Sequence, residues 1–332
     1  MTLHEVSLGD KYDLTKERIF VSGAQAIVRM LLMQRERDRL AGLSTAGFVS
    51  GYRGSPVAGI DHQMWKAAKE LSAANIVFQP GLNEELAATA CWGSQQTELL
   101  GEGKYDGVFA LWYGKGPGVD RTGDVFRHAN MAGTSKHGGV LALMGDDHAA
   151  ESSTVAHQSE FAFVDTMIPI LNPAGVQELI DYGLYGYALS RFAGTWAAIK
   201  CVKDNIESTA SVDVALERIN VVVPEFEMPP TGLNIRHEVN QLGQEERLHD
   251  YKRAAAAAFV RANGLNRIVY SGGPNAKLGI VTQSPFLFDG TVRNNIRYGR
   301  ANATNAEVDR AANMIGGGDW IASLPNGLDT QV

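Results

Sequence analysis

Short apolar, β-prone segments alternate with longer helix-like segments along the first two thirds of the chain. The clearest of these apolar segments are residues 48–50, 76–78, 108–113 and 140–144, and shorter or weaker ones follow at 168–171, 195–202 and 219–223. Strands and helices that alternate at this spacing are typical of a mostly parallel sheet with helices on both faces. The sequence therefore predicts an α/β, doubly wound domain over residues 15–223.

Polar or glycine-rich stretches follow four of the predicted strands. They are GYRGSP (51–56), GLNEE (81–85), GKGPG (114–118) and GDDH (145–148). Ligands of open α/β sheets bind outside the carboxyl ends of the strands. We therefore expect four candidate functional loops at one edge of the sheet, with GKGPG as a turn that breaks its strand.

The helix after the second predicted strand has the best-defined start. Asn83 is placed to cap it, and Glu84 and Glu85 fall in the first turn, where the helix dipole favours negative charge. Glu84 also leads a helical face that continues with Ala87, Ala88 and Cys91. A carboxylate at the lip of such a face suits a residue that holds a flat heterocycle. From the residues alone, the alternative that both glutamates only complement the dipole is favoured.

Other helices are predicted from similar signals. Ser22 can cap a helix over residues 23–41, and Asn172-Pro173 can start one that reaches about Arg191. Apolar residues at helical spacing predict a further helix over about 60–71, and an alanine-rich one follows over 244–262.

Composition narrows the class of protein. Hydrophobic residues make up 45% and charged residues 20%, and the formal net charge of −7 argues against binding to nucleic acid or an anionic membrane. No segment resembles a signal peptide, and no apolar run approaches the roughly 18 residues of a transmembrane helix; we expect a cytoplasmic protein. Cys91 and Cys201 are too few for a disulfide framework or for an iron–sulfur cluster held by this chain alone.

Five segments, in the same order, resemble the N-terminal part of indolepyruvate:ferredoxin oxidoreductase, a thiamine-diphosphate 2-oxoacid oxidoreductase. They are FVSGYRGSPVAGID (48–61), FQPGLNEELAATACWGSQQ (78–96), WYGKGPGVDRTGDVFRHAN (112–130), GDDHAAESSTVAHQSEF (145–161) and RLHDYKRAAAAAFVRANGLNRIV (247–269). The resemblance covers residues of about 10–282. It implies that the first domain is a pyrimidine-binding domain of the thiamine-diphosphate-binding fold, in an enzyme that oxidatively decarboxylates an aryl 2-oxoacid to the acyl-CoA.

The resemblance assigns roles to particular residues. Glu84 matches the catalytic glutamate that bonds a ring nitrogen of the aminopyrimidine and favours the tautomer from which the reactive ylid forms; Glu85 keeps its dipole role. Cofactor-side positions are Gly51, Gly54, Gly116 and Gly118, where glycine permits close backbone approach. Substrate-side positions are Arg53, Ser55 and His157. A guanidinium such as Arg53 pairs bidentately with a carboxylate, but an exposed arginine in a plain turn, simple tight turns at the glycines and a surface loop around His157 remain alternatives.

The chain also departs from this family. It contains no Gly-Asp-Gly motif for magnesium and the diphosphate group, and it lacks the cysteines of the 4Fe-4S clusters. The resemblance therefore implies partners: a diphosphate-binding domain, an iron–sulfur domain or subunit, ferredoxin, and CoA, in a complete enzyme expected to be a dimer. We predict no metal site within this chain and no activity of the chain alone.

The C-terminal segment has a second resemblance. VTQSPFLFDGTVRNNIRYG (281–299) and IASLPNGLDTQV (321–332) resemble part of the ATPase domain of an ABC transporter, in which Gln283 matches the glutamine that reaches magnesium and the attacking water. The Walker A pattern GxxxxGK[ST] does not occur. The two resemblances meet at GIVT (279–282), which predicts a chimera; an ABC fragment or a non-catalytic product are the alternatives.

These observations predict the following organisation. Residues 1–14 form a lead-in, 15–223 the pyrimidine-binding domain, 224–270 a linker and helix, 271–282 the start of a truncated second α/β domain, and 283–332 the ABC-like fragment. Within the last segment, we expect a helix around Asn305–Ile315 and little packing onto the first domain.

Overall fold

The structure, a computed structural model, describes residues 6–99, 101–150, 156–237, 240–268, 289–315 and 318–331. The chain divides into two compact units, Met1–Arg267 and Ile268–Val332. The predicted junction at 279–282, the second α/β domain expected to start at 271–282, and Gln283 lie outside the described residues. The proposed domain boundaries remain predictions.

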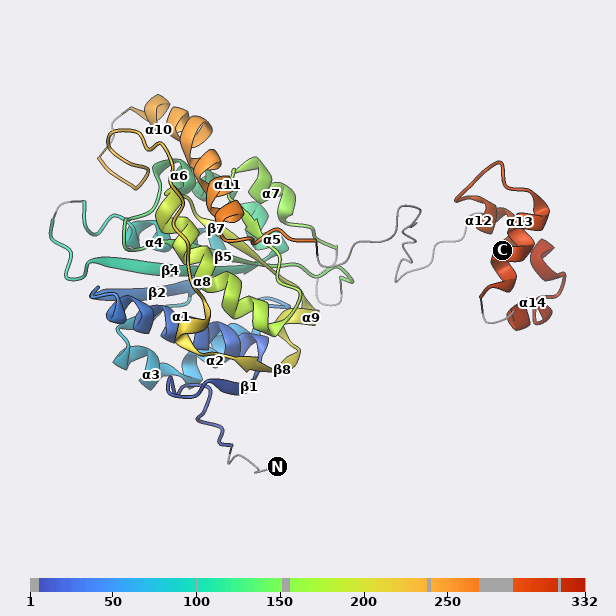
Figure 1. Cartoon of the computed structure of the whole chain (residues 1–332), viewed down its shortest axis with the longest axis horizontal. Helices are drawn as coiled ribbons and strands as arrows, with labels where there is room; N and C mark the ends of the chain where they lie inside the picture. The colour runs from blue at the N-terminus through green and yellow to red at the C-terminus, as the bar shows by residue number, and fades with distance from the viewer. Residues whose placement is uncertain are drawn as a thin grey trace. The chain divides into compact units, whose positions relative to one another are not determined.

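The first unit is built on a six-stranded sheet in which every neighbouring pair is parallel. In spatial order the strands are β3 (Ile76–Phe78), β2 (Thr45–Gly51), β4 (Gly107–Lys115), β5 (Val140–Gly145), β7 (Ala197–Cys201) and β6 (Ile170–Leu171). Helices cover both faces of this sheet (Figure 1). The fold is therefore the doubly wound α/β fold that the sequence predicted.

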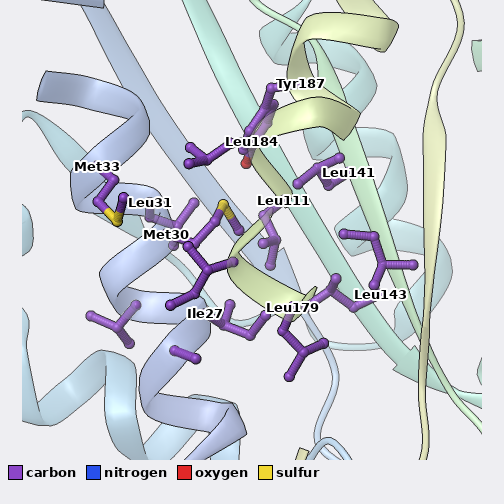
Figure 2. Close-up of a cluster of buried hydrophobic side chains, with 14 of the residues drawn as sticks. Ile27, Met30, Leu31, Met33, Leu111, Leu141, Leu143, Leu179, Leu184 and Tyr187 are labelled. Carbon is purple, nitrogen blue, oxygen red and sulfur yellow. The ribbon is translucent and has the colours of Figure 1, made fainter. Parts of the chain in front are cut away.

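Successive residues of each central strand point to opposite faces, so each face has its own core. In β4, Leu111 and Tyr113 belong to the larger core, whereas Ala110 and Trp112 belong to the smaller one. The larger core packs α1 (Gly23–Leu40) and α8 (Val176–Ala193) against the sheet, as Figure 2 shows for side chains from both helices and from the strands. The smaller core packs α4 (Glu84–Ser94), α6 (Gly123–Ala132) and α7 (Glu160–Asp165).

Local sequence signals explain where several helices begin. Ser22 caps α1 with a complete capping box that includes Gln25, and the Asn83 side chain accepts a hydrogen bond from the backbone N–H of Leu86 at 2.8 Å. Both caps were predicted. The predicted helix over 60–71 is divided at Ala67 into α2 (Gly59–Lys66) and α3 (Ala68–Ala73). The expected apolar face is nevertheless buried across the break.

Three details of the predicted strands and helices are wrong. Residues 219–223 form no strand; instead, β1 (Arg18–Ser22) pairs antiparallel with β8 (Thr209–Asp213) in a separate two-stranded sheet. Helix α8 begins at Val176, after Gly175, and not at Pro173. The GKGPG stretch is no loop, because β4 continues through Lys115 and α5 (Gly116–Arg121) starts at the next residue. Proline in the first turn of α5 needs no N–H partner, which permits this direct strand-to-helix passage.

The rest of the first unit folds back over these layers. Helix α9 (Lys203–Ile206) and the short 3-10 helix η1 (Leu216–Arg218) precede a segment without regular structure, residues 219–237. A nearly continuous helix then comprises α10 (Gln241–Arg247), the π-helical turn η2 (Leu248–Lys252) and α11 (Arg253–Ala262), which packs on α8. This agrees with the helix predicted over 244–262.

The second unit is small and helical in its described parts. It contains α12 (Val292–Arg297), α13 (Asn305–Asn313), α14 (Asp319–Ala322) and the 3-10 turn η4 (Gly327–Asp329). Helix α13 confirms the helix expected around 305–315, and Thr304 and Glu307 form its capping box. Among its described residues, Val308, Ala312 and Leu328 form a small core with partly buried neighbours such as Trp320.

Candidate functional site

The carboxyl ends of the sheet strands gather most of the sequence-predicted residues. Strand register places Gly51 of β2 beside Tyr113 of β4, and Lys115 of β4 beside Gly145 of β5. The loops that follow β2, β3 and β5, and the start of α5, therefore lie along one edge of the sheet. This arrangement was predicted from the loop positions.

Glu84 is a buried acidic residue of the predicted site. It is the first residue of α4, and 6% of its surface is exposed. Its backbone carbonyl accepts a hydrogen bond from Nε1 of Trp112 at 2.9 Å, which ties the start of α4 to β4. Ala87, Ala88 and Cys91 are buried on the same helix face, whereas Glu85 is exposed. The predicted face is thus the face that packs on the sheet.

The carboxylate of Glu84 has no protein partner in the part of the chain that the structure describes, because no hydrogen bond or ion pair reaches it there. The residue is 6% exposed, so water reaches this carboxylate only in part, and a poorly solvated polar group without a partner costs free energy. Its place at the positive N-terminal end of α4 offsets part of that cost. The carboxylate therefore retains its full capacity to accept hydrogen bonds from a ligand.

Two glycines hold the Glu84 side chain closely. A Cβ atom at Gly118 would lie 2.4 Å from Cγ of Glu84, and one at Gly114 would lie 3.3 Å from the same atom. Only glycine at 118 leaves room for the glutamate in its present position. This contact joins α4 to the first turn of α5.

His157 approaches the same helix turn at another residue. A Cβ atom at Gly116 would lie 2.3 Å from Cγ of His157, and Nε2 of this imidazole lies 3.3 Å from the Asp120 carboxylate. Residues two apart on a helix point in nearly opposite directions. Glu84 contacts α5 at Gly118, and His157 contacts it at Gly116. The two side chains therefore approach α5 from different sides.

The end of β2 and the loop after it pack closely on β4 at two glycines. A Cβ at Gly51 would lie 2.3 Å from the Tyr113 carbonyl oxygen, and one at Gly54 would lie 2.6 Å from Cδ of Lys115. Ser55 is half-buried. Arg53 is exposed, and its charge acts on the nearby Tyr113 hydroxyl, where it opposes the rise in pKa that burial of this tyrosine causes. The loop thus lies at the predicted edge, and the described protein residues leave the Arg53 guanidinium without a hydrogen bond or ion pair.

Two buried acid–hydroxyl pairs at this edge were not predicted. The Tyr113 hydroxyl donates to Asp61 of α2; burial, then this hydrogen bond and the Asp61 charge, raise the pKa of the tyrosine. Asp146, after β5, accepts from the backbone N–H of Ser159 at 2.9 Å and from its hydroxyl at 2.5 Å. Burial raises the pKa of Asp146, and the Ser159 bonds oppose the rise. Both aspartates lie in segments that resembled the oxidoreductase, but nothing local in the sequence showed which hydroxyl each would meet.

Metal and redox-active groups are scarce in the described residues. No group of three or more His, Cys, Asp or Glu residues there is placed to hold a metal ion. Cys91 and Cys201 are buried, and burial raises the pKa of both thiols well above the usual value. Within the described ranges, no helix combines the length and apolar character needed to cross a membrane.

No family model matches the chain. Curated relatives match only a short part of it. The chain is 52% identical over 56 residues to a multidrug efflux ATP-binding/permease protein of Mycobacterium bovis, which is 17% of this chain and 5% of that protein. It is 53% identical over 57 residues to an ATM1-type heavy metal exporter of Novosphingobium aromaticivorans, which is 17% of this chain and 9% of the exporter.

Among solved structures, the fold is similar to that of the 2-oxoglutarate:ferredoxin oxidoreductase from Magnetococcus marinus, with a TM-score of 0.44 and 16% sequence identity. The likeness covers 60% of this chain and 32% of the oxidoreductase chain. The chain thus spans about a third of that structure, and under a tenth of the two curated relatives named above.

Proposed function

We propose that the first unit is the pyrimidine-binding part of a thiamine-diphosphate-dependent 2-oxoacid:ferredoxin oxidoreductase, with Glu84 as the carboxylate that holds the aminopyrimidine. The observation that carries this proposal is the unpartnered, buried Glu84 carboxylate at the carboxyl edge of a parallel sheet. Ligands of such sheets bind at this edge, and a ring nitrogen bearing a proton would satisfy the carboxylate. The five segments that resemble indolepyruvate:ferredoxin oxidoreductase support the finer assignment to an aryl 2-oxoacid.

In this proposal, the residues of this chain bind and orient the cofactor and the substrate. Thiamine diphosphate, when bound, supplies a nucleophilic carbon that adds to the 2-oxoacid and accepts the electrons released on decarboxylation. Glu84 accepts the hydrogen bond of the pyrimidine ring nitrogen, and Gly118 keeps the glutamate in position. Arg53, exposed at the same edge, is available to the substrate carboxylate. His157, which lies beside the Asp120 carboxylate of α5, is assigned to the substrate-binding side of the site in this proposal.

Partner domains complete the proposed enzyme. Magnesium, the diphosphate group, CoA and the 4Fe-4S clusters are assigned to domains or subunits beyond this chain. Its described residues contain no cluster of three or more His, Cys, Asp or Glu placed to hold a metal ion, and its two cysteines are buried. We propose that ferredoxin takes the electrons and that the complete enzyme is a dimer.

Binding of thiamine and of oxythiamine to the full chain tests the role of Glu84. Oxythiamine carries a carbonyl in place of the pyrimidine amino group and serves as the matched ligand. In saturation-transfer NMR at millimolar ligand, we expect the pyrimidine signals of thiamine to respond more strongly than those of oxythiamine. The response should be lost in Glu84→Gln and kept in Glu85→Gln, since Glu85 is exposed on the same helix turn. Equal responses of both variants would contradict the assignment.

A second candidate concerns the C-terminal segment. The curated relatives are transport proteins, and their matched length of 56–57 residues is close to that of residues 281–332, which resemble an ABC ATPase. We propose that this segment derives from such an ATPase and forms a chimera with the first unit. Sequencing the genomic DNA across the codons for Ala276 to Pro285 tests this proposal: a continuous reading frame in independent reads supports a genuine chimera, whereas a break there would show an artificial junction.

A further inference from the structure

A pocket of about 480 Å³ lies in the first unit at the amino end of the sheet. Its walls come from the C-terminal turns of α1 and α8, the loop before β5 and residues 221–234. Asp38 in this pocket accepts a hydrogen bond from the hydroxyl of Thr45, the first residue of β2, at 2.7 Å, which fixes its place at the amino edge. Strands of this length separate the two edges by roughly 20 Å. The pocket is therefore distinct from the Glu84 site.

The pocket has an excess of positive charge. The Asp38 carboxylate is neutralised by Arg191, whose Nη1 and Nη2 donate to it at 2.6 and 2.8 Å. Burial, with the charges of Lys136 and Arg191, lowers the pKa of His137, which favours its neutral form. Arg37 and Lys136 remain as the uncompensated charges among the lining residues.

Arg37 presents a bidentate donor edge. One of its nitrogens, Nη1, donates to the carbonyl of Leu216. Across the described residues, no hydrogen bond or ion pair holds its Nε and Nη2 groups. These two N–H groups are parallel and match the two oxygens of a carboxylate. Lys136, exposed at the pocket, adds a second cation for the same anion.

Much of the remaining lining is apolar. Leu184 and Phe192 of α8 and Val221 and Met228 of the irregular segment are among the lining residues. A volume of about 480 Å³ lies within the usual range of small-molecule sites, roughly 300–1,000 Å³. An apolar wall with a few convergent donors is the usual composition of such sites. We propose that this pocket binds a small organic monoanion, a carboxylate joined to an apolar body, with the carboxylate on Arg37 and Lys136.

Isothermal titration of the full chain with naphthalene-1-acetate tests this proposal, with naphthalene-1-acetamide as the matched neutral ligand and inorganic phosphate as an anion without an apolar body. We expect the acid to bind and the amide and phosphate to bind at least about tenfold more weakly, because charge-assisted hydrogen bonds to Arg37 are lost or the apolar contacts are missing. Arg37→Gln and Lys136→Gln should each weaken binding of the acid, by about tenfold for Arg37→Gln.

Arg39→Gln is the matched control, because Arg39 lies two residues further along α1, pairs with Glu36 and does not line the pocket. It should bind the acid as the unchanged chain does. Circular dichroism checks that each variant is folded. If Arg37→Gln does not fold, binding of the acid by Lys136→Gln decides the test, because Lys136 is exposed. No binding of the acid at millimolar concentration, equal binding of acid and amide, or binding unaffected by both pocket substitutions would overturn the proposal. The inference does not depend on the function proposed for the Glu84 site.

Discussion

Two carboxylates, one at each edge of the central sheet, are almost equally buried but are surrounded very differently. Asp38, at the amino edge, is 3% exposed and accepts hydrogen bonds from Gln34, Thr45 and both terminal nitrogens of Arg191. Glu84, at the carboxyl edge, is 6% exposed and accepts none from the residues that the structure describes. A buried charge that the fold has paired supports the fold, whereas one left unpaired costs stability and suits a ligand site.

The largest expected effect concerns the paired carboxylate. Asp38→Ala should lower the free energy of unfolding of the first unit by about 3–5 kcal/mol, because it leaves the largely buried Arg191 guanidinium without its counter-charge. Chemical denaturation measures the change. Asp165→Ala is the control: its ion pair with Arg127 is exposed on both sides and should contribute about 0–1 kcal/mol. Equal effects of the two variants would show that Asp38 is not a structural charge.

Packing around the unpaired carboxylate gives the next largest effect. Gly118→Ala should destabilise the fold by about 1–3 kcal/mol, because the added methyl group overlaps the Glu84 side chain. Gly123→Ala, where a Cβ meets no atom within 4 Å, should change stability by less than about 1 kcal/mol in either direction. The cost of Gly118→Ala should fall in a Glu84→Ala background, measured by a double-mutant cycle. An unchanged cost there would place the strain elsewhere.

A buried cation extends the comparison. Lys252 is fully buried, and its Nζ donates to the carbonyls of Asn130 and Met131 at the end of α6, while burial and then the Arg236 charge lower its pKa to about 7. Above pH 7 the folded chain has released this proton, whereas the unfolded chain keeps it up to near the ordinary lysine pKa of 10.5. The unfolded state thus binds more protons in this window, and the contribution of Lys252 to the free energy of unfolding rises with pH.

Denaturation of the unchanged chain and of Lys252→Met at pH 6, 8 and 10 measures this contribution. The unchanged chain should gain stability relative to the variant between about pH 7 and 10. A difference that does not vary with pH would contradict the lowered pKa.

The smallest stability effect is expected for Glu84 itself. Glu84→Gln removes a charge that no described protein group pairs, so the free energy of unfolding should change by less than about 1 kcal/mol or increase. Thermal and chemical denaturation check this value beside that of Asp38→Ala. A loss comparable to that of Asp38→Ala would mean that Glu84 is a structural residue.

Much of the fold could be predicted because its signals are local. Strand–helix alternation indicated the parallel sheet, and the caps Ser22 and Asn83 marked helix starts by side-chain chemistry alone. The β1–β8 pair could not be predicted in this way, because the two strands lie about 190 residues apart in the sequence. Neither segment has a local pattern that distinguishes it from a loop or from the residues next to a helix. Residues 219–223 have strand propensity but form no strand. Val221 and Val223 instead line a pocket together with residues of α1 and α8, and such tertiary context overrides propensity.

The gathering of the candidate residues at one edge of the sheet could be predicted, but their contacts could not. Loop positions indicated that these segments share one edge of the sheet, and helical spacing indicated the buried face of Glu84. Gly118 contacts Glu84 and Gly116 contacts His157 because β4 passes directly into α5. The glycine-rich sequence at this point instead predicted a turn. The separation of Glu84 from His157 by α5 follows from the same passage.

Turnover of a complete enzyme tests the central claim most directly. Residues 6–268 would be joined to the diphosphate-binding and iron–sulfur domains of a 2-oxoacid:ferredoxin oxidoreductase, and ferredoxin reduction would be measured with an aryl 2-oxoacid for Glu84→Gln and Glu85→Gln. We expect Glu84→Gln to lower turnover by about 10²–10⁴-fold, as loss of a proton-handling group does, in a protein that still folds, and Glu85→Gln to retain it. Turnover that is the same in both variants would contradict the assignment of Glu84 as the pyrimidine-binding carboxylate.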